Sequence, residues 1–200
     1  MVSENSPDDR YLAETVQRSA KILVVGAFGV GKTTLIGSVS EIAPLRTEET
    51  MTMASVGVDD LAGMEGKTTT TVAMDFGRIT VSPHLVLYLF GTPGQRRFWD
   101  LWEGLAEGAV GALVLVDTRR LERSFEVLDQ VETHIPALPF AVAVNHFPNS
   151  RNHDAEELSE ALDLPPDTPV ADCDARDRAS SAQALITLVQ HALSLQKVPS

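Results

Sequence analysis

The sequence predicts an α/β fold with a mostly parallel six-stranded sheet, one antiparallel edge strand and helices on both faces. Short apolar runs alternate with longer amphipathic segments, which is typical of strands joined by helical crossovers. Two neighbouring runs are instead joined by Ser82-Pro83, turn chemistry that favours a hairpin and hence one antiparallel strand. A chain of 200 residues is long enough for one such domain with a buried core.

The first half of the chain contains the hairpin and a long segment without periodicity. The apolar run Lys21–Val25 predicts the first strand, and Lys32–Val39 predicts a helix directly behind it. Ser40–Thr71 is rich in Thr, Met and Gly and is predicted to be a long functional loop. Thr71–Val81 and His84–Phe90 then form the predicted hairpin.

The second half alternates regularly between strands and helices. Continuous apolar runs predict buried strands at Ala109–Val116, Phe140–Val144 and Thr168–Cys173. Helical spacing of apolar residues predicts helices at Gln95–Gly108, Leu121–His134, Asp154–Leu162 and Ser181–Gln196. Ligands in such sheets bind at the carboxyl ends of the parallel strands, so we expect the site there.

Charge and composition restrict the classes of partner. The chain has 16 basic and 28 acidic residues, a formal net charge of -12, which argues against general affinity for nucleic acid or anionic membrane. The single cysteine suits a reducing compartment. We expect a cytoplasmic protein without a direct membrane anchor, with a flexible acidic tail over residues 1–18 and one domain over residues 19–197.

The strongest motif is the sequence GAFGVGKT, residues 26–33, which fits the phosphate-binding pattern GxxxxGK[ST]. An apolar strand precedes it and a helix follows, as that pattern requires. Its glycines let the backbone wrap a phosphate, and the helix N-terminus adds partial positive charge. We expect the nucleotide to contact Gly26, Gly29, Val30, Gly31, Lys32, Thr33 and Thr34. Lys32 is expected to reach the β- and γ-phosphates, and Thr33 to bind Mg²⁺.

Four segments together carry a resemblance to a known family: FGVGKTT (28–34), KTTTTVAMDFGRI (67–79), GTPGQRRFW (91–99) and CDARDR (173–178). They resemble the Ras-like small GTPases, more narrowly the bacterial MglA-like polarity switches and the actinobacterial conservon GTPases. The resemblance spans roughly residues 21–196. It implies a Ras-like P-loop nucleoside triphosphatase (NTPase) fold that binds GTP or GDP with Mg²⁺.

The resemblance also implies roles for the two switch segments. Thr71, with Thr70 as the alternative, matches the switch I threonine that closes on Mg²⁺ and the γ-phosphate. In switch II, Gly94 would present its N–H to the γ-phosphate, and Gln95 would orient the attacking water. Lys32, Thr71 and Gln95 are therefore the expected catalytic residues, and Thr33 and Thr71 the expected metal ligands.

Switch II departs from the family where the metal is held. Gly91 stands in place of the aspartate that normally holds Mg²⁺ through water. Another carboxylate has to substitute for it, or metal binding is weaker; Asp117, at a neighbouring strand end, is one candidate. Phe28 also departs from the glycine of Ras, and its ring would crowd the γ-phosphate.

The base-reading motifs match least well. Asn145-His146-Phe147-Pro148 lies where NKxD is expected, so Asn145 and His146 would meet the base, but Pro148 replaces the aspartate that reads guanine. Asp174-Ala175-Arg176 matches the SAK-like motif, in which the Ala175 N–H would meet guanine O6. Guanine preference is therefore implied by the resemblance and not supported by residue 148.

These observations predict a GTP-binding molecular switch with slow intrinsic hydrolysis. The resemblance implies roadblock-type regulatory proteins as partners, with a sensor kinase as a further one, and Arg46 is a candidate arginine finger. The alternative is a catalytically degenerate nucleotide-binding interaction module without turnover. A P-loop kinase is less favoured, because the sequence shows no lid or acceptor-site signature.

Overall fold

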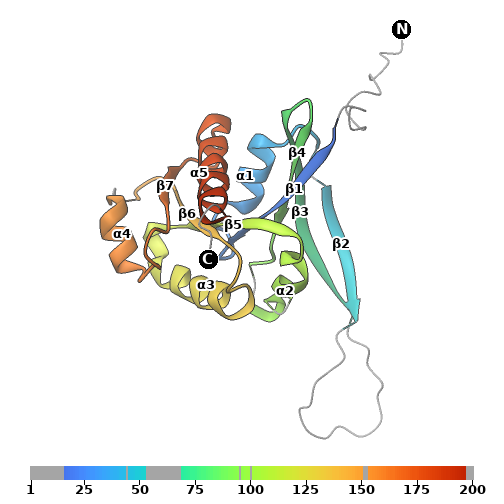
Figure 1. Ribbon diagram of the computed structural model, residues 1–200. Coiled ribbons are helices and arrows are strands. Elements are labelled where there is room, and N and C mark those ends of the chain that lie inside the picture. Colours follow the sequence, from blue (N-terminus) through green and yellow to red (C-terminus); the bar gives the residue numbers. More distant parts are fainter. Residues whose placement is uncertain are drawn as a thin grey trace, which may run out of the picture.

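The protein forms one twisted sheet with helices on both faces (Figure 1). The computed structural model describes residues 16–43, 45–52, 69–94, 96–99, 101–150 and 153–196. Residues 1–15, the greater part of the predicted acidic tail, lie outside these ranges. The predicted α/β fold class, with its mostly parallel sheet, is confirmed.

The sheet has seven strands in the order β2-β3-β4-β1-β5-β6-β7. Only β3 runs against the others, because it pairs antiparallel with both β2 and β4, while every remaining pairing is parallel. The strands are β1 Arg18–Gly26, β2 Leu45–Thr52, β3 Thr69–Ser82, β4 Leu85–Gly91, β5 Ala109–Val116, β6 Phe140–Asn145 and β7 Val170–Cys173. The helices are α1 Lys32–Val39, α2 Leu101–Ala106, α3 Leu121–His134, α4 Ala155–Ala161 and α5 Arg178–Gln196, with short 3₁₀ turns η2 Arg96–Phe98 and η3 Thr118–Arg120.

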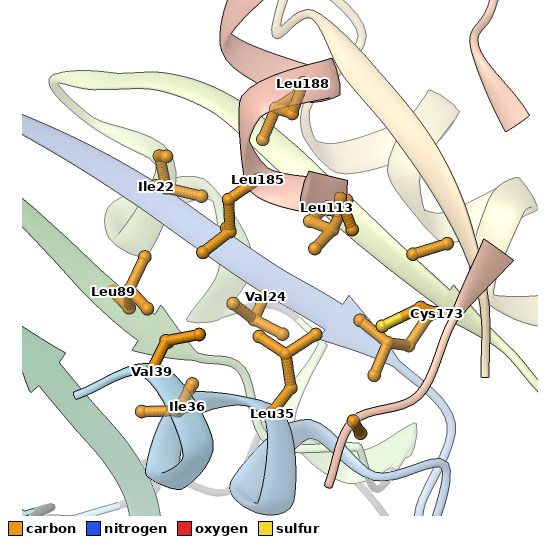
Figure 2. Packing of buried hydrophobic residues seen from close by; sticks show 14 of the residues in the cluster. Ile22, Val24, Leu35, Ile36, Val39, Leu89, Leu113, Cys173, Leu185 and Leu188 are labelled. Carbon is orange, nitrogen blue, oxygen red and sulfur yellow. The ribbon is translucent and has the colours of Figure 1, made fainter. Parts of the chain in front are cut away.

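The central strand β1 divides the core into two layers. Ile22 and Val24 point to the face covered by α1 and α5, while Leu23 and Val25 point to the face covered by α2, α3 and α4. Figure 2 shows the first layer, where Ile22 and Val24 lie among α1, α5 and neighbouring strand side chains. Successive strand residues alternate between faces, so an unbroken apolar run fills both layers. This explains why β1 and β5 read as continuous hydrophobic segments.

The predicted number of strands was wrong by one. The segment Ser40–Thr71, expected to be a loop, contributes β2, and β3 begins two residues earlier than expected. The sequence of β2, LRTEETMT, lacks the apolar alternation that marks a half-buried strand. Its order comes from the antiparallel ladder to β3, between Leu45↔Phe76 and Thr52↔Thr69. The antiparallel strand is therefore second from the edge, and β2 covers it.

The helical segment after switch II is shorter than predicted. Instead of one helix over Gln95–Gly108, the chain forms the turn η2 and the six-residue α2. Leu121–His134 forms a helix with the predicted bounds, in which Val127, Leu128 and Val131 are buried and Phe125 is exposed. Among the helices that the structure describes, none has the length and apolar character needed to cross a membrane.

Candidate functional site

The phosphate loop joins the carboxyl end of β1 to the first turn of α1. Its backbone has positive φ angles at Gly26 (149°), Gly29 (79°) and Gly31 (110°), a conformation that residues other than glycine rarely adopt. Gly31 is the N-cap of α1, and no side chain caps that helix. The first N–H groups of α1 have no partner within the helix and remain available to an anion.

Lys32 lies beneath this loop with only 9% of its surface exposed. Its Nζ donates to the carbonyl oxygens of Gly26 (2.6 Å) and Ala27 (2.9 Å). Burial lowers its pKa to about 8, and the negative charge of Asp75 opposes that shift. The negative charge of an anionic ligand would stabilise the protonated form of this desolvated amine.

The start of α1 is linked to β3 by an interaction that the sequence did not suggest. The hydroxyl of Thr33 donates to Asp75 Oδ2 at 2.5 Å, while Thr34 beside it is exposed. Asp75 pairs across the ladder with Gly91. A Cβ placed on Gly91 would lie 3.2 Å from Asp75 Cβ and 3.4 Å from Asp75 Oδ2. The Asp75 carboxylate therefore reaches the side-chain space that Gly91 leaves empty.

Asp117, the candidate carboxylate named from the sequence, is hydrogen-bonded to the guanidinium of Arg119. Its oxygens accept from the Arg119 side chain at 2.9 and 2.8 Å and from the Arg119 N–H at 3.0 Å. The hydrogen bond from the Arg119 side chain is the main cause that lowers the Asp117 pKa. Arg119 in turn lies over the Phe147 ring, 3.8 Å from its centroid. Asp117 is therefore linked through Arg119 to the loop after β6, whereas Asp75 is the carboxylate that accepts from Thr33.

Sequence reasoning missed Asp75 because it looked for a replacement at strand ends. A usable signal was present: Asp75 lies in the run VAMDFG, where a carboxylate interrupts an apolar strand, and β3 neighbours the strand that ends at Gly91. Within the described residues no group of three or more His, Cys, Asp or Glu side chains is arranged to hold a metal ion. A metal here needs hydroxyl and phosphate oxygens in addition to Asp75, as Mg²⁺ sites commonly do.

The segment after β4 packs directly onto the phosphate loop. Thr92 is buried and donates its N–H to Val24 O at 3.0 Å. A Cβ on Gly94 would lie 2.7 Å from Lys32 Nζ and 2.8 Å from the backbone nitrogen of Phe28. Only glycine fits this approach, so the backbone of Gly94 lies beside the lysine amine. The predicted residue Gln95 follows immediately and lies outside the described residues.

A buried tryptophan connects this segment to α2. Trp102 is fully buried, and its Nε1 donates to Pro93 O at 3.4 Å. On the other side, Arg96 in η2 forms an ion pair with Glu126 on α3. The phosphate loop, the segment 92–94 and the turn to α2 are therefore one packed unit.

The predicted switch I threonine lies in β3, where the backbone of Thr71 pairs with Thr50. Arg46, the candidate arginine finger, lies in β2, and its backbone pairs with that of Asp75 in β3. The side chains of Thr70, Thr71 and Arg46 lie outside the described part of the structure.

Asn145 joins the phosphate loop to the two loops expected to hold the base. It is buried at the end of β6; its Nδ2 donates to Val30 O at 2.8 Å, and its Oδ1 accepts the Ala175 N–H at 3.0 Å. A Cβ on Gly31 would lie 2.5 Å from Asn145 Nδ2, so Gly31 is needed for this approach as well as for its φ angle. The Ala175 N–H, expected to meet guanine O6, is engaged by Asn145 instead.

The remaining base-loop residues also bond within the protein. The His146 N–H donates to Cys173 O at 2.7 Å, and its ring lies 3.7 Å from Asp172. Asp174 accepts from the Arg176 side chain at 2.9 and 2.8 Å, and these bonds are the main cause that lowers the Asp174 pKa to about 2. The structure thus brings the residues predicted around Asn145 to one edge of the sheet, beside the phosphate loop.

A GxxxxGK[ST] loop between a parallel strand and a helix, with a buried lysine and a Thr–Asp pair beside it, defines a P-loop nucleotide-binding protein of the NTPase class. The chain belongs to the family described as conserved hypothetical ATP binding protein, whose sequence model matches residues 24–195.

Individual relatives support the fold and the class. The chain is 28% identical to the uncharacterized protein MJ1339 of Methanocaldococcus jannaschii over 127 residues, 62% of this chain and 68% of that protein. It is 29% identical to the human Ras-related protein Rab-40A-like over 151 residues, 74% of this chain but only 46% of that protein. The G domain of the T. maritima FeoB iron transporter superposes with a TM-score of 0.61 at 16% identity, covering 88% of this chain and 99% of that domain. This last likeness shows the fold, which is that of a P-loop GTPase-like domain.

Proposed function

We propose that the protein is a molecular switch that binds GTP and GDP with Mg²⁺, hydrolyses GTP slowly and signals through partner proteins. The observation that carries the proposal is the contact of Gly94 with the phosphate loop, beside Lys32 Nζ. A phosphate that enters the loop has to reorganise this contact. Because Trp102 fixes Pro93 to α2, such a displacement is transmitted to a surface element.

Metal binding is assigned to residues of α1 and β3. Thr33 Oγ1 and the Asp75 carboxylate would hold Mg²⁺, Asp75 taking the place of the aspartate lost at position 91, and Thr71 would approach from switch I. The metal would neutralise charge on the phosphate oxygens during transfer. Lys32, buried and bonded through Nζ to two backbone carbonyl oxygens, would hold the β- and γ-phosphates.

Slow hydrolysis follows from the surroundings of the γ-phosphate. Gln95 would orient the attacking water. Phe28 is 67% exposed at the phosphate loop, so its ring can reach the space where water and Gln95 have to meet. Unless Arg46 or a partner supplies an arginine, charge developing in the transition state is poorly stabilised. Roadblock-type regulators and a sensor kinase remain the proposed partners, and they rest on the resemblance in the switch segments.

The first experiment is titration calorimetry of GDP and GTPγS, with Mg²⁺, on the wild-type protein and Lys32→Ala. We expect binding to weaken by at least about a hundredfold in Lys32→Ala, because several charge-assisted hydrogen bonds to phosphate are lost. The matched control is Lys21→Ala, since Lys21 lies on β1 with its Nζ 5.1 Å from the Phe90 ring and bonded to Glu107 O. Failure of the wild type to bind any nucleotide would disprove the proposal.

A binding module without turnover is the second candidate, favoured by the exposed Phe28 and by Gly91. Multiple-turnover phosphate release from GTP separates it from the switch. A slow but continuing release that is abolished in Lys32→Ala supports the switch. Nucleotide binding with no release beyond one equivalent, with or without an added arginine-bearing partner, supports the module.

A further inference from the structure

The carboxyl end of the sheet beside the phosphate loop, called the base edge below, offers few groups that could distinguish one base from another. This edge is formed by the loops that follow β6 and β7, and Asn145 holds it against Val30 and Ala175. If nucleotide binds as proposed above, the phosphates occupy the loop and the base lies along this edge. The inference below therefore rests on the proposed function and deepens it.

Guanine and adenine differ only in the donors and acceptors on their edges. Guanine presents its O6 acceptor and its N1–H and N2–H₂ donors, whereas adenine presents an N6–H₂ donor and the N1 acceptor. A site prefers guanine when a carboxylate accepts from N1–H and N2–H₂, or when a free N–H donates to O6. Selectivity therefore requires unengaged polar groups at the base edge.

Three backbone N–H groups at this edge already donate to acceptors within the protein. The Ala175 N–H donates to Asn145 Oδ1, the Arg176 N–H to Asp174 Oδ1, and the His146 N–H to Cys173 O. Each of these N–H groups would have to break a bond of 2.7–3.0 Å to meet a base oxygen. None of these three N–H groups is therefore free to meet guanine O6.

The two positions at which the base-reading motifs would place an acidic or polar side chain are constrained as well. Position 148 is proline, which has neither a side-chain acceptor nor a backbone N–H. Asp174 directly precedes Ala175, and both of its oxygens already accept from Arg176. A guanine that bonded to Asp174 would have to displace the bidentate, charge-assisted pair with Arg176. The loss of that pair would cancel most of the binding free energy that the new hydrogen bonds contribute.

We propose that the base site accepts adenine and guanine nucleotides with comparable affinity, so that the protein responds to the phosphates of a purine nucleotide rather than to its base. Affinity then comes from the phosphate loop, Lys32 and the metal, which are common to both nucleotides. Sites built to hydrogen-bond one substrate group reject an analogue by about 10⁴-fold or more, whereas here Pro148 supplies no acceptor and the Ala175 N–H and Asp174 are already engaged.

The test measures dissociation constants of GDP and ADP, with Mg²⁺, on the full chain by competition against one fluorescent nucleotide. We expect the two constants to agree within about tenfold. A preference of more than about a hundredfold for GDP would overturn this inference and leave the proposed function standing, whereas the same preference for ADP would overturn this inference and the guanine specificity of the proposed function. Absence of binding for both nucleotides would overturn the proposed function and this inference together.

Two variants at one position sharpen the result. Pro148→Asp introduces the missing acceptor, and we expect it to shift the ratio roughly ten- to a hundredfold toward GDP, the value of a charge-assisted hydrogen bond. Pro148→Ala removes the ring without adding an acceptor, and its ratio should match the wild type. An unchanged ratio in a Pro148→Asp protein that circular dichroism shows to be folded would contradict the placement of the base at this edge.

Discussion

Asp75 and Gly91 are cross-strand neighbours whose side-chain space is shared. A carboxylate on β3 reaches the region that a carboxylate on β4 would otherwise fill, and it accepts from Thr33 there. The chemistry of a metal site depends on where an oxygen lies, not on which strand carries it. At the residue scale, loss of an expected aspartate at position 91 is therefore compatible with an intact metal site.

Asp75→Asn tests this assignment. The amide keeps the shape and can still bond Thr33, but it lacks the charge that favours a divalent cation. We expect the tightening of nucleotide binding by Mg²⁺ to fall by about tenfold or more, measured by calorimetry with Mg²⁺ and with EDTA. Asp117→Asn is the control, because Asp117 is bonded to Arg119; a larger loss of Mg²⁺ dependence in that variant would reverse the assignment.

At the scale of elements, α2 and the segment before it are joined through two tryptophans, Trp102, which is fully buried, and Trp99, which is partly buried. Trp102 Nε1 has a partner, Pro93 O, whereas Trp99 Nε1 is buried and has no hydrogen-bond partner in the described part of the structure. The rings lie 6.2 Å apart, between centroids. The pair thus offers matched positions at which the same substitution removes a used or an unused donor.

We expect Trp102→Phe to lower the free energy of unfolding by about 2–4 kcal/mol, because it leaves Pro93 O unpaired and opens a cavity in the core. Trp99→Phe should cost at least about 1 kcal/mol less, since no hydrogen bond is lost there. Urea unfolding followed by circular dichroism measures both values. Equal costs, or the reverse order, would show that the Trp102–Pro93 bond does not stabilise this unit.

At the scale of the whole molecule, the buried Lys32 makes the free energy of unfolding vary with pH in the alkaline range. Lys32 titrates at about 8 in the folded protein, against 10.5 as its ordinary value. Between these values the unfolded chain binds more protons, so the free energy of unfolding rises with pH. The penalty of burying the charged amine is fully present below pH 8 and is relieved above about pH 10.5.

The size of this effect follows from the difference between the two pKa values. We expect the free energy of unfolding of the wild type to rise by about 3 kcal/mol between pH 8 and pH 10.5 from Lys32 alone. Other groups titrate there too, so the measured quantity is the difference between wild type and Lys32→Met in urea unfolding at several pH values. Lys32→Met should lack this gain. Parallel pH profiles for the two proteins would mean that Lys32 is not desolvated as the structure indicates.

Much of the fold follows from local patterns in the sequence. The apolar runs of β1, β5 and β6 and the spacing of α3 and α5 are visible because burial on one or both faces imposes a period on the residues themselves. The phosphate loop is equally visible, since its three positive φ angles require glycines at fixed positions. These features are local, and one stretch of sequence is enough to find each of them.

The remaining features depend on contacts between distant residues. β2 is ordered by its ladder to β3 and not by any apolar alternation of its own. Asp75 meets Thr33 across 42 positions of sequence, and Asn145 meets Val30 across 115. The sequence alone determined that this is a P-loop α/β protein and which residues form its phosphate loop. The tertiary structure decided which carboxylate lies beside Thr33 and which base-edge groups are already engaged, because these depend on strand order and loop packing that no local pattern records.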